Sequence, residues 1–252
     1  MKNVKLSAFT LAEVLITLGI IGVVATMTIP TLINNYQKKQ YVSSLQKAYT
    51  QFNQVLIKLA EENGCAGDLA CTGLFENDEN SEILGKEIAK HFKVLKDCGV
   101  EANAGCFAST LKTNYDGTGS DSVDYDASVT RYKFITVDGI SYRLGNYNNN
   151  NCNNSWSTGV TGHMKKTCGI VLIDVNGPKK GPNYLGRDIF NFFITNGNGP
   201  LLYPDGGADS NYNGTNNWWK NPSTNEPRWC LPGAMGWRCA GRVMEEGWEM
   251  NY

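Results

Sequence analysis

The sequence predicts an α+β protein in which one long N-terminal helix precedes an antiparallel β-sheet within a disulfide-bonded head. Three observations lead to this prediction. Residues 9–33 are almost entirely apolar and continue into an amphipathic helical pattern over residues 34–63. Apolar residues alternate with polar ones on both sides of Asp138-Gly139, which is typical of a β-hairpin. All eight cysteines follow the apolar segment.

The composition excludes several function classes. The chain has 252 residues, with 23 Lys+Arg against 24 Asp+Glu, so no global field attracts it to nucleic acid. Its length suits one elaborated domain plus an anchor. The two histidines, His91 and His163, have no neighbouring cysteines at metal-ligand spacing, and we expect His91 to be a surface or packed residue. No arrangement of residues predicts a catalytic site, so we expect no enzyme.

Residues 9–33 are predicted to span a membrane. This stretch includes thirteen Phe, Leu, Ile or Val residues, together worth about −4 to −8 kcal/mol for insertion. The one charge, Glu13, costs on the order of 3 kcal/mol at mid-membrane and less near the end of the span. Lys2 and Lys5 place the N-terminus in the cytoplasm by the positive-inside rule. The alternative is a secretory signal cleaved after Ala25, although the apolar run continues to residue 33.

Residues Ala8 to Ile16, with the sequence AFTLAEVLI, follow a short basic leader. This stretch resembles the prepilin cleavage and methylation motif of type IV pilins and type II secretion pseudopilins. That family is cut before a Phe or Met, which is then N-methylated, and has a Glu five residues into the mature chain. Phe9 and Glu13 have this spacing, and Pro30 stands where the family commonly has a proline. The residue before the cut is usually Gly in the family and is Ala8 here.

The resemblance implies a pilin-like subunit of a type IV pilus or a type II secretion pseudopilus. Prepilin peptidase would remove the leader, residues 1–8, and Phe9 would become the N-methylated first residue. The head would lie outside the bacterial inner membrane, and later in a filament in the periplasm or at the cell surface. The implied partners are further copies of the chain, minor pilins, the inner-membrane assembly platform and its ATPase.

Glu13 has a physical role that does not depend on the name of the family. Cleavage before Phe9 exposes an α-amine one turn away from Glu13. An unpaired carboxylate in lipid is costly, and pairing it with the amine of a neighbouring subunit removes much of that cost. We therefore expect Glu13 to set the register between identical helices. The alternative is a Glu that extends to the membrane interface.

The amphipathic segment, residues 34–63, is predicted to continue the anchor as one helix from Phe9 to Glu62. A bend or local melting is expected at Pro30 and near Gly19 and Gly22. Asn63-Gly64 suits the end of the helix, because Gly readily adopts the left-handed cap conformation. The apolar positions that predict this helix are Tyr41, Val42, Leu45, Ala48, Tyr49, Phe52, Val55, Leu56 and Leu59.

The head, residues 64–252, is predicted to hold one further helix and several strands. The helix spans Ser81 to Lys96, with Ile83, Leu84, Ile88, Phe92 and Leu95 on one face. The hairpin strands lie on either side of Asp138-Gly139. Further strands are expected over residues 169–175 and 188–194, followed by a short element over residues 241–250.

The eight cysteines favour an oxidising compartment, because none forms a C-x-x-C pair and their number is even. Eight cysteines allow 105 connectivities, and the short separations favour pairing between sequence neighbours. Reduced, buried thiols are the alternative. The candidates are Cys65 with Cys71, Cys98 with Cys106, Cys152 with Cys168, and Cys230 with Cys239.

Two kinds of loop are candidates for binding. Asp174, Asn176 and Asp188 partly resemble a calcium loop, and some pseudopilins bind calcium in a similar region, but an Asx turn explains the same residues. No other cofactor is expected. Residues 146–157 and 203–221 are rich in Asn and predict exposed turns. Trp218-Trp219 could bind a glycan or a surface, as in a minor pilin or adhesin, or could cover the core.

Overall fold

The computed structural model describes residues 10–76, 81–119, 122–147, 151–153, 162–196, 201–207 and 229–252. The chain divides into two compact units, one ending at Gln40 and one beginning at Tyr41, and each is described by itself. The elements are, in chain order, α1 (Leu11–Glu62), η1 (Ala70–Thr72), α2 (Ser81–Ala89), β1 (Val94–Gly99), β2 (Leu111–Lys112), β3 (Ser122–Val123), β4 (Tyr132–Thr136), β5 (Ser141–Asn146), η3 (Gly162–Lys166), β6 (Thr167–Asp174), β7 (Ile189–Thr195), β8 (Leu202–Pro204) and α3 (Cys239–Glu245).

Helix α1 is one uninterrupted helix of 52 residues. It continues through Gly19, Gly22 and Pro30 without unwinding, so the local melting expected there is absent, and the kink at Pro30 stays a prediction. The helix ends where the sequence predicts, because Gly64 has a φ of 70° and the N–H of Cys65 donates to the carbonyl of Ala60 at 2.8 Å.

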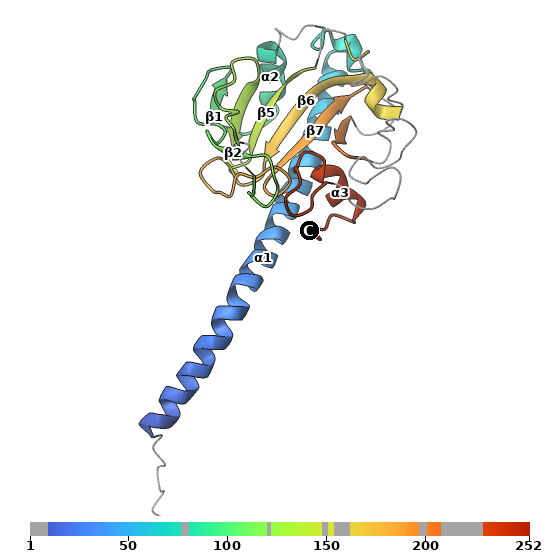
Figure 1. Cartoon of the computed structure of the whole chain (residues 1–252). Helices are drawn as coiled ribbons and strands as arrows, with labels where there is room; N and C mark the ends of the chain where they lie inside the picture. Colours follow the sequence, from blue (N-terminus) through green and yellow to red (C-terminus); the bar gives the residue numbers. More distant parts are fainter. Residues whose placement is uncertain are drawn as a thin grey trace, which may run out of the picture. The chain divides into compact units, whose positions relative to one another are not determined.

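The head is built on a six-stranded antiparallel sheet with the order β1-β4-β5-β6-β7-β8 (Figure 1). The predicted hairpin is β4 and β5. Gly139 at its turn has a φ of 84°, a conformation that suits glycine. The two later predicted strands are β6 and β7, with ends shifted by one or two residues. The predicted α+β class is confirmed at this level. The C-terminal element expected over residues 241–250 is α3, which begins two residues earlier, at Cys239, and ends five residues earlier, at Glu245.

The predicted helix over Ser81 to Lys96 is wrong beyond Ala89. Helix α2 ends there, and residues 94–99 form the edge strand β1, which pairs with β4. Phe92, between the two, packs on Phe134 with ring centroids 5.3 Å apart. Leu95, expected on the apolar face of the helix, is 67% exposed. The helical spacing of apolar residues was misleading because pairing with β4, distant in sequence, decides the local conformation.

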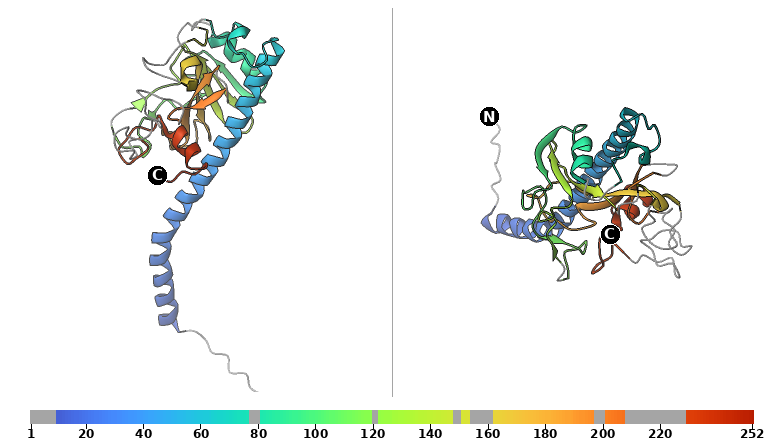
Figure 2. Two further views of the ribbon diagram at one scale, coloured as in Figure 1. Left: turned by 90° about the vertical axis from the view of Figure 1, so that its right-hand side faces the viewer. Right: turned by 90° about the horizontal axis from the view of Figure 1, so that it is seen from above.

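The second half of α1 lies along one face of the sheet and supplies much of the core (Figure 2). Every apolar position that predicted this helix is buried except Tyr49, which is partly buried. The centre is aromatic: Phe52 lies 5.9 Å from Phe92 and 5.7 Å from Tyr142, measured between ring centroids. On the opposite face, loops cover a smaller cluster made of Phe107, Leu111, Leu172, Leu185 and Ile189.

Four disulfides close short loops in the head, and the pairs are those expected between sequence neighbours. They join Cys65 to Cys71, Cys98 to Cys106, Cys152 to Cys168, and Cys230 to Cys239, with Cα–Cα distances from 4.0 to 6.3 Å. Cys239 begins α3, and its Sγ occupies the space that a Cβ on Gly186 would need. The last disulfide therefore packs α3 against the loop between β6 and β7.

Candidate functional site

The first half of α1 presents apolar side chains that the described chain does not cover. The helix is long and apolar enough to cross a membrane, and a signal sequence near the N-terminus would meet the same test. The exposed apolar side chains are Leu11, Val14, Leu15, Ile16, Leu18, Ile20, Ile21, Val23, Val24, Met27, Ile29, Leu32 and Ile33. An apolar surface of this extent marks a site for lipid or for another apolar surface.

Glu13 is part of a capping box at the start of α1. Its Oε2 accepts hydrogen bonds from the backbone N–H of Thr10 at 2.8 Å and from the Thr10 hydroxyl at 2.7 Å. In return, the N–H of Glu13 donates to the Thr10 hydroxyl at 3.3 Å. This reciprocal arrangement satisfies backbone donors that a helix start leaves unpaired. Thr10 was missed as a site residue, although the S/T-x-x-E signature is present in the sequence.

The other polar groups along this half of the helix are satisfied within it. The hydroxyls of Thr17, Thr26 and Thr28 donate to the carbonyls of Val14, Val23 and Val24 at 2.8 to 3.0 Å. Such internal bonds lower the cost of placing hydroxyls in lipid. Ala8 and Phe9, the predicted cleavage site, lie outside the described residues.

The calcium candidates Asp174, Asn176 and Asp188 come together on the loop between β6 and β7. Asp174 Oδ1 accepts from the N–H groups of Asn176 at 3.2 Å and Gly177 at 2.8 Å, which is the expected Asx turn. Both carboxylates are fully buried. Burial, with the nearby charge of Asp188, raises the pKa of Asp174 to about 8. Burial raises the pKa of Asp188 to about 6.

Three oxygens on this loop have no hydrogen-bond donor among the described residues: Oδ2 of Asp174 and the amide oxygens of Asn176 and Asn183. Buried oxygens without donors are the groups that a hard cation such as Ca²⁺ satisfies. No group of three or more His, Cys, Asp or Glu side chains that could hold a metal occurs in the described part of the chain. Amide oxygens would therefore have to complete any calcium site here.

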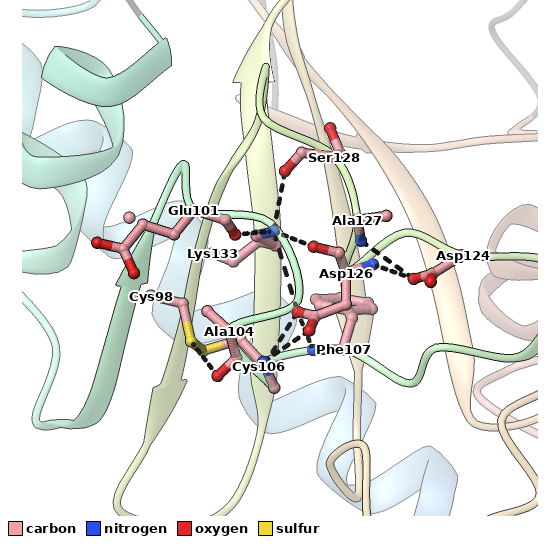
Figure 3. A network of polar contacts seen from close by, with 12 residues as sticks. Cys98, Glu101, Ala104, Cys106, Phe107, Asp124, Asp126, Ala127, Ser128 and Lys133 are labelled. Atoms are coloured by element: carbon pink, nitrogen blue, oxygen red, sulfur yellow. Dashed lines mark hydrogen bonds and ion pairs between the residues drawn. A yellow bond between two sulfur atoms is a disulfide. The ribbon is translucent and has the colours of Figure 1, made fainter.

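Lys133 of β4 and Asp126 form a buried ion pair that the sequence did not predict, and both side chains hydrogen-bond to the backbone of the loop closed by Cys98 and Cys106 (Figure 3). The ammonium of Lys133 is fully buried and donates to the carbonyls of Glu101 at 2.6 Å, Asp126 at 2.5 Å and Ser128 at 2.9 Å. It lies 3.9 Å from Oδ1 of Asp126. Burial lowers the pKa of Lys133.

Asp126 completes this network by accepting three backbone N–H groups, from Gly105 at 2.6 Å, Cys106 at 3.0 Å and Phe107 at 3.1 Å. The Lys133 ammonium and both carboxylate oxygens of Asp126 are therefore satisfied by described residues of the head. We interpret this cluster as a structural clamp, because no reactive group in it is left free to meet a substrate.

The remaining predicted residues are placed as follows. His91 Nε2 lies 3.3 Å from Glu62 Oε2, and its side chain is mostly buried. The side chain of His163 and Trp218-Trp219 lie outside the described residues. Residues 203–221 were expected to form exposed turns. This expectation is wrong for the first residue of the segment, because Tyr203 is buried in β8. Similarly, Asn146 is buried at the end of β5.

Comparison of the chain with protein-family models, with curated proteins and with solved structures finds no match. The functional inference therefore depends on the residues of this chain.

Proposed function

We propose that the protein is a membrane-anchored structural subunit of an extracytoplasmic filament, either a type IV pilus or a type II secretion pseudopilus. The first half of α1 carries this proposal. Its apolar side chains are exposed, and between residues 11 and 33 its one charged side chain is Glu13, which lies in the first turn. A signal sequence would account for an apolar helix here, but a segment that is removed gains nothing from a carboxylate at its first turn.

The exposed apolar surface suits two successive environments. In the monomer, lipid covers residues 11–33. In the filament, the same surface packs against the equivalent helices of other copies. Because lipid and helix surfaces are similarly apolar, the transfer between them has little hydrophobic cost, and close packing and polar contacts decide the register.

Glu13 supplies the polar contact. In the monomer, Thr10 stabilises the carboxylate through Oε2, and no described residue donates to Oε1. Cleavage before Phe9 creates an ammonium, and the ammonium of a neighbouring copy pairs with Glu13 during assembly. A charge pair in a low-dielectric environment is stronger than in water, so a correctly placed neighbour is favoured over a misplaced one.

The head suits an extracytoplasmic location. Its four disulfides require an oxidising compartment such as the periplasm. A chain with its N-terminus in the cytoplasm and one span delivers the head to that compartment, in agreement with the basic leader.

The test replaces Glu13 with Leu in cells that make the filament. We expect mature protein beginning at Phe9 to accumulate in the membrane, because neither insertion nor cleavage needs the carboxylate, while sheared filaments are lost. Glu61→Leu is the matched control, because Glu61 is an exposed Glu of the same helix, and it should leave filaments intact. Normal filaments from Glu13→Leu would overturn the proposed role of the carboxylate.

A further inference from the structure

Arg143 is a partly buried arginine on the face of the sheet opposite the main core. Its neighbours in β5, Tyr142 and Leu144, belong to that core, so strand alternation places Arg143 on the other face. Across the strands, Arg143 lies beside Lys133 of β4 and Leu172 of β6. Leu172 belongs to the apolar cluster of this second face. The guanidinium therefore lies against apolar side chains as well as solvent.

No carboxylate neutralises this guanidinium. Arg143 forms no hydrogen bond and no ion pair with any residue that the structure describes, and its Nε is buried without an acceptor. The carboxylate of Asp126, in the neighbouring structural clamp, is already used by Lys133 and by three backbone N–H groups. A partly desolvated charge without a partner is costly. An anion that binds here would therefore lower the free energy of the folded head.

The surroundings of Arg143 strengthen its attraction for an anion. Burial lowers the pKa of Arg143 to about 10, the Tyr125 hydroxyl opposes this effect, and the like charge of Arg131 adds to it. The guanidinium is still fully charged at neutral pH. Both its lost hydration and the nearby like charge favour the approach of a negative group.

Two partly buried aromatic rings lie beside the guanidinium. The Cζ of Arg143 lies 4.5 Å from the ring centroid of Tyr125, in a cation–π contact. The ring of Trp237 meets that of Tyr125 edge to face, with centroids 6.1 Å apart. Both rings pack on the apolar cluster that contains Leu172, which holds them in place. We call Arg143, Tyr125 and Trp237 the Arg143 site.

The donors of the Arg143 site suit a carboxylate on a hydroxylated ring. A planar guanidinium matches a carboxylate through two parallel hydrogen bonds, which its terminal nitrogens supply because Nε is buried. The Tyr125 hydroxyl and the Trp237 Nε1–H form no hydrogen bond with any described residue, so both are available to ligand hydroxyls. Trp237 is also partly exposed, and its indole offers apolar surface on which a sugar ring packs.

We propose that the Arg143 site binds a uronic acid, a sugar whose ring bears a carboxylate. The carboxylate pairs with Arg143, while the ring and its hydroxyls contact Trp237 and Tyr125. An acidic peptide also offers a carboxylate, but its side chains lack ring hydroxyls for the two aromatic donors. The site lies within the head alone, so this inference goes beyond the proposed filament function and does not depend on it.

The test titrates the full chain, in neutral-detergent micelles, with glucuronate and follows binding by ligand-observed NMR. Glucose is the matched control ligand, because it has a hydroxymethyl group in place of the carboxylate. We expect glucuronate to bind roughly tenfold more tightly than glucose or better, because hydrogen bonds between two charged groups are stronger than neutral ones. High salt should weaken the binding of glucuronate and leave that of glucose unchanged.

The variants separate the guanidinium from general positive charge. Arg143→Gln should weaken glucuronate binding roughly tenfold, and Arg143→Lys should weaken it severalfold, because the charge stays but the planar fork is lost. Trp237→Leu should also weaken it severalfold. Arg131→Gln is the matched control, because Arg131 donates to Ser81 and Thr130 instead, and its loss should change binding by less than about twofold.

Several results would overturn the proposal. Equal binding of glucuronate and glucose would do so, as would unchanged glucuronate binding in a folded Arg143→Gln variant. Circular dichroism checks the fold of each variant. If Arg143→Gln does not fold, unchanged binding in both Arg143→Lys and Trp237→Leu would overturn the proposal instead. Triglutamate that binds more tightly than glucuronate would exclude the sugar and assign the site to an acidic peptide. None of these results bears on the filament, which the Glu13→Leu variant tests separately.

Discussion

Asp174 and Asp188 are fully buried carboxylates at opposite ends of one loop, and the charge of Asp188 adds to burial in raising the pKa of Asp174 to about 8. Two like charges without a cation are costly at neutral pH. The folded head therefore favours protons or a cation at this loop.

The pH dependence of stability follows from these pKa values. Both acids titrate near 4 when unfolded, and near 8 and 6 when folded. At a pH between the unfolded and the folded pKa, the folded state binds more protons than the unfolded state does. Stability therefore falls as pH rises from about 4 to about 8. For Asp188 alone, the loss between pH 5 and pH 8 is on the order of 1.5 kcal/mol, or roughly 3–6 °C in Tm. Thermal unfolding at pH 5 and pH 8 measures it, and the Asp174→Asn variant should show a weaker dependence. A flat profile in the unmodified chain would contradict the buried pair.

Calcium should act against this destabilisation. At pH 8 Asp188 is largely ionised, Asp174 is about half ionised, and oxygens of the loop lack donors, so a millimolar addition of Ca²⁺ should raise Tm by several degrees. At pH 5 the effect should be smaller because protons compete for the same oxygens. An identical Tm with and without Ca²⁺ at pH 8 would show that the loop is not a calcium site.

Replacing Lys133 with Met should destabilise the head strongly. The change leaves three buried carbonyls without their donor and the buried Asp126 without its cation, which costs about 3–5 kcal/mol. Lys47→Met is the matched control, because it also removes a Lys–Asp pair but an exposed one, worth at most about 1 kcal/mol. Urea unfolding of the two variants compares them. Similar losses in both would refute the structural clamp.

Removing the Cys230–Cys239 bond by a double Ala substitution should lower stability by about 2.5–3 kcal/mol, because this short loop is then unconstrained when unfolded. Thermal unfolding of the variant is compared with that of the unmodified head. A loss below about 1 kcal/mol would mean that packing, and not the bond, holds α3 in place.

Processing is tested at Ala8. Replacing it with Trp should leave an inserted but uncleaved precursor, because the cut requires a small residue and insertion does not. The Ala8→Gly variant has the residue that is usual in the pilin family at this position, and it should be cleaved as the unmodified chain is. N-terminal mass spectrometry distinguishes the products, and a mature chain beginning at Thr26 would establish an ordinary signal peptide.

The capping box is tested at Thr10. The Thr10→Val variant loses both hydrogen bonds of the hydroxyl, and the first turn of α1 should open about fivefold more often, for a cap worth about 1 kcal/mol. Hydrogen exchange of the first-turn amides in nanodiscs measures this opening. Thr10→Ser keeps the hydroxyl and should behave like the unmodified chain. Equal exchange in all three would show that the cap contributes nothing.

Much of the architecture could be predicted from sequence because its signals are local. The buried face of α1 follows from residues three and four apart, its end from Gly64, and the β4–β5 turn from Asp138-Gly139. Pairing between neighbouring cysteines also depends on short separations alone. In each case a few adjacent residues decide the conformation, whatever packs on them later.

What the tertiary structure decided depends on partners far away in the chain. Lys133 lies between Tyr132 and Phe134, so strand alternation alone would expose it, yet a loop beginning 32 residues earlier covers it and supplies the carbonyl of Glu101. Residues 94–99 have helical spacing and become a strand because β4 offers them a hydrogen-bonding edge. Local patterns contain no information on such partners, because the free energy that selects them arises only when distant segments bury each other's polar groups.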